Sequence, residues 1–141
     1  MANEGVLVHT GPLVALLSER DQHHAACVSA SKTLRGPFFT SWAVIKEAAY
    51  LLKDRQDAVG KLLSRVRASR LRILQLTADD VDGISGILTK YGDQDFDFAD
   101  STLMHLSQRE GIESVFTVDQ RHFSVFRTAQ GNRLILVPES M

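Results

Sequence analysis

Short apolar segments alternate with longer amphipathic segments along the chain. The short segments are rich in β-branched and aromatic residues and lack polar alternation, which is typical of strands buried on both faces of a parallel sheet. We expect strands at residues 5–8, 38–40, 71–76, 114–117 and 134–137. Apolar residues at helical spacing predict helices at residues 12–17, 21–34, 42–52, 57–68, 77–90 and 99–109. This alternation predicts an α/β fold with a parallel sheet and helices on both of its faces.

Local residue signals set several of the helix boundaries. Gly11-Pro12 is interpreted as a tight turn after the first strand, and the proline, with its fixed φ angle, opens the next helix. Ser41 is a good N-cap for the helix that follows the second strand. Thr77 together with Asp80 resembles a capping box, and Gly111 is expected to be a C-cap.

The composition is that of an ordinary globular domain. Hydrophobic residues make up 44% and charged residues 23% of the 141 residues, without internal repeats or low-complexity linkers. We therefore expect a single domain over residues 1–141. No apolar run approaches the roughly 20 residues needed to cross a bilayer. The N-terminus lacks a secretory signal pattern, so we expect a cytoplasmic protein. Cys27 is the only cysteine, which excludes an internal disulfide and argues against a cysteine-based zinc site.

The net charge of −1 gives no general argument for binding nucleic acid or membranes, but the charges are unevenly distributed. A basic stretch contains Lys61, Arg65, Arg67, Arg70 and Arg72, and an acidic stretch contains Asp93, Asp95, Asp97 and Asp100. The basic stretch is interpreted as a solvated helix face, with guidance of RNA phosphates as the alternative. Asp93 and Asp95 are interpreted as solvated loop residues. An EF-hand is excluded, because Phe98 stands where that calcium loop requires glycine.

Polar residues gather at the predicted carboxyl ends of the strands, where sites form in parallel α/β sheets. They are His9 and Thr10 after the first strand, Thr40 and Ser41 after the second, Thr117 and Asp119 after the fourth, and Asp97 and Asp100 at the start of the preceding helix. Glu47 lies on an otherwise apolar helix, which favours a role in a site over a solvated position. We expect these groups to converge on one crevice.

The carboxylates of this set suggest a type of chemistry. Clustered carboxylates repel one another unless they are protonated or bind a cation, and their hard oxygen ligands suit Mg²⁺ or Mn²⁺. Such ions activate water and neutralise the charge that builds on a phosphodiester. The set therefore predicts a metal-dependent nuclease, and the chemistry alone leaves a phosphatase as an alternative.

Four stretches resemble the PIN-domain family and, within it, the VapC-type toxins of bacterial toxin–antitoxin pairs. They are VLVHTGPLVAL (6–16), SWAVIKE (41–47), DFDFADS (95–101) and FTVDQRHF (116–123), in family order. The resemblance implies a three-layer α/β/α PIN-like fold, one or two divalent metal ions and endonucleolytic cleavage of RNA. Position by position, it implies that Glu47, Asp100 and Asp119 bind the metal with Asp97 as an accessory acid, and that Thr10 and Thr117 supply hydroxyl groups to the site.

The family pattern has Asp at the end of the first strand, where this chain has His9. Imidazole binds Mn²⁺ but is a poor ligand for Mg²⁺, removes one negative charge, and can donate a hydrogen bond to a neighbouring carboxylate. We therefore expect an endoribonuclease scaffold that is weakly active or inactive. The sequence leaves two origins of His9 open, an engineered replacement and a natural loss of catalysis. The alternative is a non-catalytic PIN-fold protein that binds an antitoxin or RNA. A phosphatase ranks last, because no Asp-x-Asp follows the first strand.

The resemblance also implies the partners of the chain. They are an RNA substrate, a cognate antitoxin that presents Arg or Lys to the acidic crevice, and a second copy of the chain in a homodimer. The residues outside the motifs receive structural roles. His23, His24 and His105 are interpreted as solvated, His122 as structural, and Trp42 as a core residue.

Overall fold

A five-stranded parallel sheet forms the centre of the computed structural model, which describes residues 3–138. The strands are β1 (Asn3–Val8), β2 (Phe38–Thr40), β3 (Arg72–Ile73), β4 (Ile112–Phe116) and β5 (Ile135–Val137), in the spatial order β3-β2-β1-β4-β5. Every neighbouring pair is parallel. The central strand β1 is buried over Val6, Leu7 and Val8, as its unbroken apolar run predicts.

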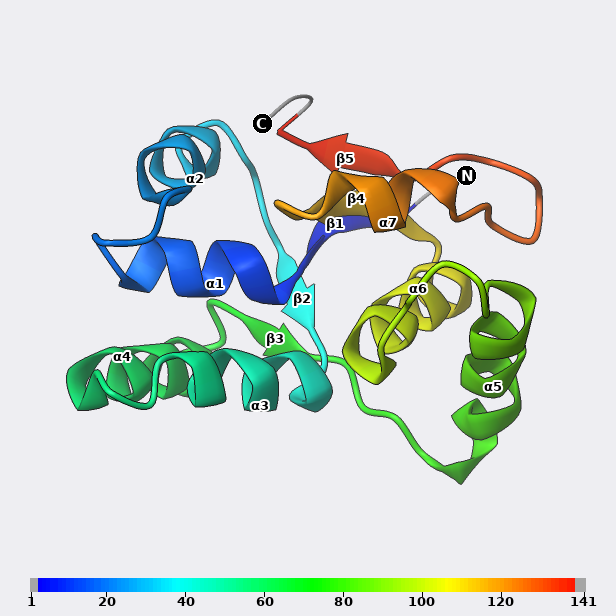
Figure 1. The fold of residues 1–141 in the computed structure, drawn as a ribbon, viewed down its shortest axis with the longest axis horizontal. Coiled ribbons are helices and arrows are strands. Elements are labelled where there is room, and N and C mark those ends of the chain that lie inside the picture. The colour runs from blue at the N-terminus through cyan, green and yellow to red at the C-terminus, as the bar shows by residue number, and fades with distance from the viewer. Residues whose placement is uncertain (1–2, 139–141) are drawn as a thin grey trace.

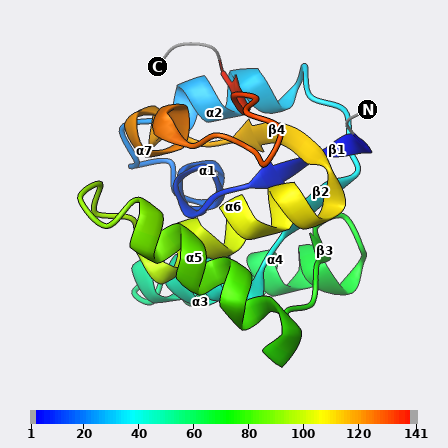
Figure 2. The same cartoon turned by 90° about the vertical axis from the view of Figure 1, so that its right-hand side faces the viewer.

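Helices cover both faces of this sheet, so the predicted α/β/α fold is confirmed. They are α1 (Thr10–Leu17), α2 (His24–Ser31), α3 (Trp42–Leu51), α4 (Gln56–Arg67), α5 (Val81–Lys90), α6 (Phe98–Glu110) and α7 (Gln120–Val125), with a 3-10 turn at Ala78–Asp80. In Figure 1, α1, α2 and α4 lie on one side of the strands and α5 and α6 on the other. Figure 2 views the molecule from the side of α5 and α6. The helix α3 contacts both α1 and α6.

Several predicted boundaries are confirmed by the hydrogen bonds at the helix ends. The side chain of Ser41 caps α3 by accepting a hydrogen bond from the backbone N–H of Val44. Thr77 and Asp80 form the reciprocal capping box before α5. Gly111 ends α6 with a φ of 69°, in the left-handed region that favours glycine.

Other boundaries differ from the sequence prediction. The first helix begins at Thr10, so Gly11-Pro12 lies in its first turn and does not form a tight turn before it. A Cβ at Gly11 would overlap a methyl group of Val118, so glycine lets this turn approach the loop after β4. The strand expected at 71–76 has two residues, the helix expected at 21–34 spans His24–Ser31, and α7 was not predicted.

Three side chains differ from their predicted environments. Trp42 is 50% exposed and not a core residue, because it lies on the outer face of α3. His105 is not solvated, because its Nε2 lies 2.8 Å from Oδ1 of the buried Asp80. His24 is half-buried, and its Nδ1 lies 2.6 Å from the carbonyl oxygen of Ala15. Cys27 is buried, and burial raises the pKa of its thiol to about 11. Within residues 3–138, no helix has the length and apolarity that a bilayer span requires.

Candidate metal-binding site

The carboxyl ends of β1 and β4 bring His9 and Thr117 together. These two strands are hydrogen-bonded neighbours, and the pairing continues one residue further, because the backbone N–H of His9 donates to the carbonyl oxygen of Phe116 at 2.9 Å. His9 is 6% exposed and Thr117 is fully buried. The expected site therefore starts at the centre of the sheet, where two adjacent parallel strands end.

The His9 imidazole is held on both of its nitrogens. Its Nε2 lies 2.7 Å from Oδ1 of Asp100, and its Nδ1 lies 3.0 Å from Oγ1 of Thr117. The same threonine oxygen accepts the backbone N–H of Asp119 at 2.9 Å. Both ring nitrogens of His9 and the Thr117 hydroxyl have hydrogen-bond partners when Thr117 donates its hydroxyl proton to Nδ1 and the Nε2–H of His9 donates to Asp100. Phe123 packs edge-on against the imidazole, with ring centroids 4.9 Å apart.

Asp100 is placed by the first turn of α6. Its backbone N–H donates to Oδ1 of Asp97 at 2.8 Å, and its own Oδ2 accepts the backbone N–H of Asp97 at 3.2 Å, which completes a capping box. Burial opposes ionisation of Asp100, but the hydrogen bonds from His9 and from the Asp97 backbone hold its pKa below the usual range. Asp100 is therefore a buried, charged carboxylate.

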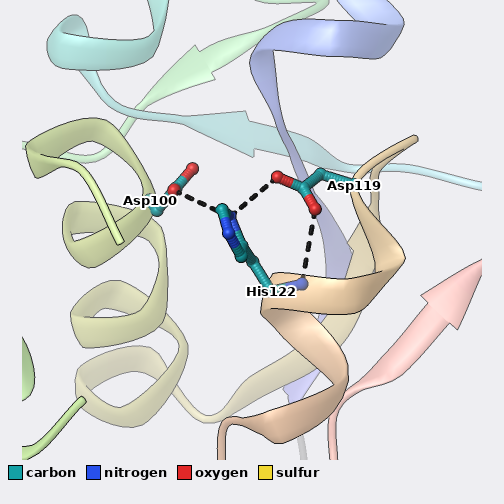
Figure 3. Close-up of side chains that lie close together, drawn as sticks. All are labelled: Asp100, Asp119 and His122. Carbon is teal, nitrogen blue, oxygen red and sulfur yellow. Dashed lines mark hydrogen bonds and ion pairs between the residues drawn. The ribbon is translucent and has the colours of Figure 1, made fainter. Parts of the chain in front are cut away.

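Asp119 and His122 complete the cluster from the start of α7 (Figure 3). Oδ2 of Asp119 lies 2.8 Å from Nδ1 of His122, and Oδ2 of Asp100 lies 3.5 Å from the same nitrogen. One ligand atom from each of the three side chains lies within 4.8 Å of the others. His122 was interpreted from the sequence as structural, and the structure instead places it between two of the predicted acidic residues.

Glu47 and Asp97 lie beside this cluster, in a groove between α3 and α6. The groove is lined by Ala43, Lys46, Glu47, Tyr50, Leu51, Asp97, Phe98 and Ala99. Although Asp97 as a whole is exposed, burial of its carboxyl group, together with the charges of Asp100 and Glu47, raises its pKa to about 6. Of the four predicted acids, Asp100 and Asp119 lie in the cluster with His122, whereas Glu47 and Asp97 lie outside it among the described residues, in the adjoining groove.

The last predicted site residue, Thr10, follows His9 at the start of α1. It is 3% exposed, and its Oγ1 has no hydrogen-bond partner among the described residues. A buried hydroxyl normally has a partner, so an unpaired one at the end of a central strand is consistent with a site that accepts a further group.

The basic stretch lies apart from these residues. All five of its side chains are exposed, and three of them, Lys61, Arg65 and Arg70, line a shallow groove along α4. Asp93 and Asp95 are exposed on the loop before α6, as predicted. The interpretation of the basic stretch as a solvated face fits its exposure, and guidance of RNA phosphates stays a prediction.

The chain is similar to known proteins over most of its length. The family model described as "PIN domain" matches residues 6–128. Ribonuclease VapC26 of Mycobacterium tuberculosis (strain ATCC 25618 / H37Rv) is 27% identical over 135 residues, which cover 94% of this chain and all of the relative. The crystal structure of Mycobacterium tuberculosis VapC20, described as a sarcin-ricin loop cleaving toxin, superposes with a TM-score of 0.77 at 21% identity, covering 84% of this chain and 92% of VapC20.

Proposed function

Because the chain belongs to the PIN domain family, we propose that it is built as the endoribonuclease toxin of a toxin–antitoxin pair. Two printed names support this function, since the relative VapC26 is called a ribonuclease and the structural neighbour VapC20 is called a sarcin-ricin loop cleaving toxin. The observation that carries the proposal is the meeting of Asp100 and Asp119, from separate parts of the chain, at the carboxyl ends of β1 and β4.

We propose that this site holds Mg²⁺ or Mn²⁺. The fit rests on the donor set, because the ligand atoms of Asp100, Asp119 and His122 lie within 4.8 Å of one another, while Asp97 and Glu47 add negative charge at the adjoining groove. A divalent ion at this position would activate water and neutralise charge on the phosphodiester. Asp100 and Asp119 would hold the ion, Glu47 and Asp97 would support it, and the hydroxyl groups of Thr10 and Thr117 would line the site.

His9 weakens this activity for two physical reasons. It supplies no carboxylate at a position where the family pattern has one, and its Nε2 engages Oδ1 of Asp100, which occupies one oxygen of a carboxylate that would hold the ion. We therefore propose that the chain as written is weakly active or inactive. The same contact favours the second candidate function, a non-catalytic PIN-fold protein that binds an antitoxin or RNA.

Replacing His9 by Asp tests the ribonuclease function. The His9→Asp form should cleave structured RNA in the presence of Mn²⁺ at least about 10- to 100-fold faster than the parent chain, because a missing ligand of the ion is restored. A chelator should abolish this cleavage. Adding Asp100→Asn to the His9→Asp form should return cleavage to the parent level. Failure of the His9→Asp form to cleave any RNA tested with Mg²⁺ or Mn²⁺ would refute the proposal.

Calorimetry with Mn²⁺ separates the two candidate functions. A scaffold that has lost catalysis only through His9 should gain Mn²⁺ affinity in the His9→Asp form. A binding protein with no remaining metal function should show little affinity for Mn²⁺ in either form, while it still binds its antitoxin or RNA.

We further propose that the chain pairs with a cognate antitoxin and forms a homodimer. An antitoxin that presents Arg or Lys would place a positive charge among the carboxylates, where the metal ion would otherwise lie. The surface proposed for the second copy consists of Tyr50, Leu51 and Phe98, which we call the α3–α6 patch. These three side chains are 57%, 58% and 57% exposed and line the same groove.

A further inference from the structure

We infer that His122 is a metal ligand through Nδ1, and that it shifts the preference of this site from Mg²⁺ towards ions that favour nitrogen, such as Co²⁺ and Zn²⁺. The inference rests on the proposed function only in placing a cation between Asp100 and Asp119. It adds a nitrogen ligand to the acidic residues, from a position that the resemblance to the family did not assign.

The spacing of the three ligand atoms fits a single ion. Metal–ligand bonds of about 2.1 Å, at angles between about 90° and 109°, separate neighbouring ligand atoms by about 3.0–3.4 Å. Nδ1 of His122 lies 2.8 Å from Oδ2 of Asp119 and 3.5 Å from Oδ2 of Asp100. The remaining pair, the carboxylate oxygens of Asp100 and Asp119, lies within 4.8 Å, so the two carboxylates would close towards the His122 nitrogen when one cation binds between them.

The imidazole nitrogen is also free of competing hydrogen bonds. Nδ1 of His122 is enclosed, and in the part of the chain that the structure describes it has no hydrogen-bond partner, since the nearby Oδ2 of Asp119 lies at bonding distance but not in a hydrogen-bonding direction. A neutral imidazole that carries its proton on Nε2 would direct the Nδ1 lone pair at the ion. His9 cannot take this role in the same way, because both of its nitrogens are engaged.

Surrounding contacts hold the His122 ring in this orientation. The backbone N–H of His122 donates to Oδ1 of Asp119 at 3.3 Å, so both residues are fixed in the first turn of α7 (Figure 3). Phe96 packs edge-on against the ring, with centroids 5.5 Å apart. A ligand that is already oriented loses little conformational entropy when an ion binds.

The choice of ion follows from the chemistry of the donors. Imidazole suits Zn²⁺ and the later first-row ions, whereas Mg²⁺ prefers an octahedron of oxygen atoms. With His9 in place of a carboxylate, the site has lost one oxygen ligand and one negative charge, which further disfavours Mg²⁺. Zn²⁺ and Co²⁺ bind most sites more tightly than Mg²⁺ does. A test of the role of His122 therefore compares the ratio of the Co²⁺ affinity to the Mg²⁺ affinity between the parent chain and its variants.

Isothermal titration of the full chain with Co²⁺ and with Mg²⁺ tests the inference, using His122→Asn and a matched control, His23→Gln. His23 is half-buried at the start of α2, outside the candidate site. His122→Asn keeps a polar atom near the position of Nδ1 but removes the imidazole. It should lower the Co²⁺ affinity about tenfold or more, change the visible absorption of bound Co²⁺, and leave the Mg²⁺ affinity nearly unchanged. His23→Gln should change none of these.

A measurement on the parent chain avoids dependence on the folding of a variant. Zn²⁺ should shift the ring resonances of His122 in nuclear magnetic resonance spectra and leave those of His23 in place. Equal Co²⁺ affinity in the parent and a folded His122→Asn form, or unshifted His122 resonances at saturating Zn²⁺, would overturn the inference. In either case cleavage of RNA by the His9→Asp form would still decide the ribonuclease proposal, so the two can fail separately.

Discussion

Thr117 joins three parts of the candidate site through one oxygen atom. Its Oγ1 contacts Nδ1 of His9 and accepts the backbone N–H of Asp119, and the side chain is fully buried at the end of β4. His9 in turn contacts Asp100. The hydroxyl therefore fixes the relative positions of the first strand, the fourth strand and the start of α7. Thr10, next to His9 in the chain, is also buried, but its hydroxyl is unpaired within residues 3–138.

Substitution of each threonine by valine should therefore have opposite consequences. Thr117→Val keeps the shape of the side chain but leaves a ring nitrogen and a backbone N–H unpaired, which should destabilise the fold by about 1–3 kcal/mol. Thr10→Val removes a hydroxyl that has no partner, so stability should be unchanged or slightly higher. Urea denaturation with chelator present measures both. Equal losses in the two variants would show that the hydrogen bonds of Thr117 contribute no specific stability.

The residues of this site were predictable from the sequence to different degrees. Thr117 and Asp100 could be found because they follow or precede recognisable strands and helices, and parallel strands end at a common edge. His122 was missed because it joins the site only through the first turn of α7, a six-residue helix with too few apolar positions to show a period. The Asp119-x-x-His122 spacing was the available signal, since residues three apart face the same side of a helix.

At the scale of elements, the contact between α5 and α6 depends on a buried charged group. Asp80, just before α5, accepts the backbone N–H of Thr77 and contacts His105 and Arg109 on α6, with its Oδ1 at 2.8 Å and 3.1 Å from them. The Thr77 and His105 hydrogen bonds hold the pKa of Asp80 well below its usual range, against the effect of burial, and Arg109 acts in the same direction. The ring of His105 also packs against Gly83 of α5.

Alanine substitutions at two glycines of α5 test this packing. A Cβ at Gly83 would overlap the His105 ring, which cannot move without losing its contact to Asp80. A Cβ at Gly86 would meet nothing within 4 Å. Gly86→Ala should therefore stabilise the chain by about 0.5–1 kcal/mol through helix propensity. For Gly83→Ala, an overpacking cost of about 1–3 kcal/mol should exceed that gain. Similar unfolding midpoints for both variants would mean that His105 is free to move.

The elements themselves were predictable wherever the sequence carries a repeated pattern. The central strands β1, β2 and β4 were found from unbroken apolar runs, α3 and α6 from helical spacing with a recognisable cap, and α4 from helical spacing alone. The edge strand β3 is shorter than its apolar run, because only Arg72 and Ile73 pair with β2 and the chain then turns away towards α5. Pairing with a neighbour, which a single segment does not encode, decides where an edge strand ends.

At the scale of the whole molecule, the strand order places the candidate site and the α3–α6 patch side by side. The central position of β1 brings the ends of β1 and β4 next to the start of α6, and α6 packs against α3. The groove of the patch therefore contains Glu47 and Asp97 as well as its apolar side chains. Lys46 lines the same groove, and Nζ of Lys53 lies 4.0 Å from the Tyr50 ring centroid.

A surface with both signs of charge around exposed apolar groups suits pairing with an identical surface. A two-fold axis brings each patch against its own copy, so a lysine of one chain can meet a carboxylate of the other while the apolar side chains are buried together.

We expect the parent chain to sediment at twice the mass of one chain at micromolar concentration. Leu51→Arg should shift it to the monomer, because an unpaired charge would be buried at the contact. Val81→Arg, at a residue that is 54% exposed on α5, should leave the dimer intact. A parent chain that stays monomeric, or a dimer that resists Leu51→Arg but dissociates with Val81→Arg, would move the interface away from α3 and α6.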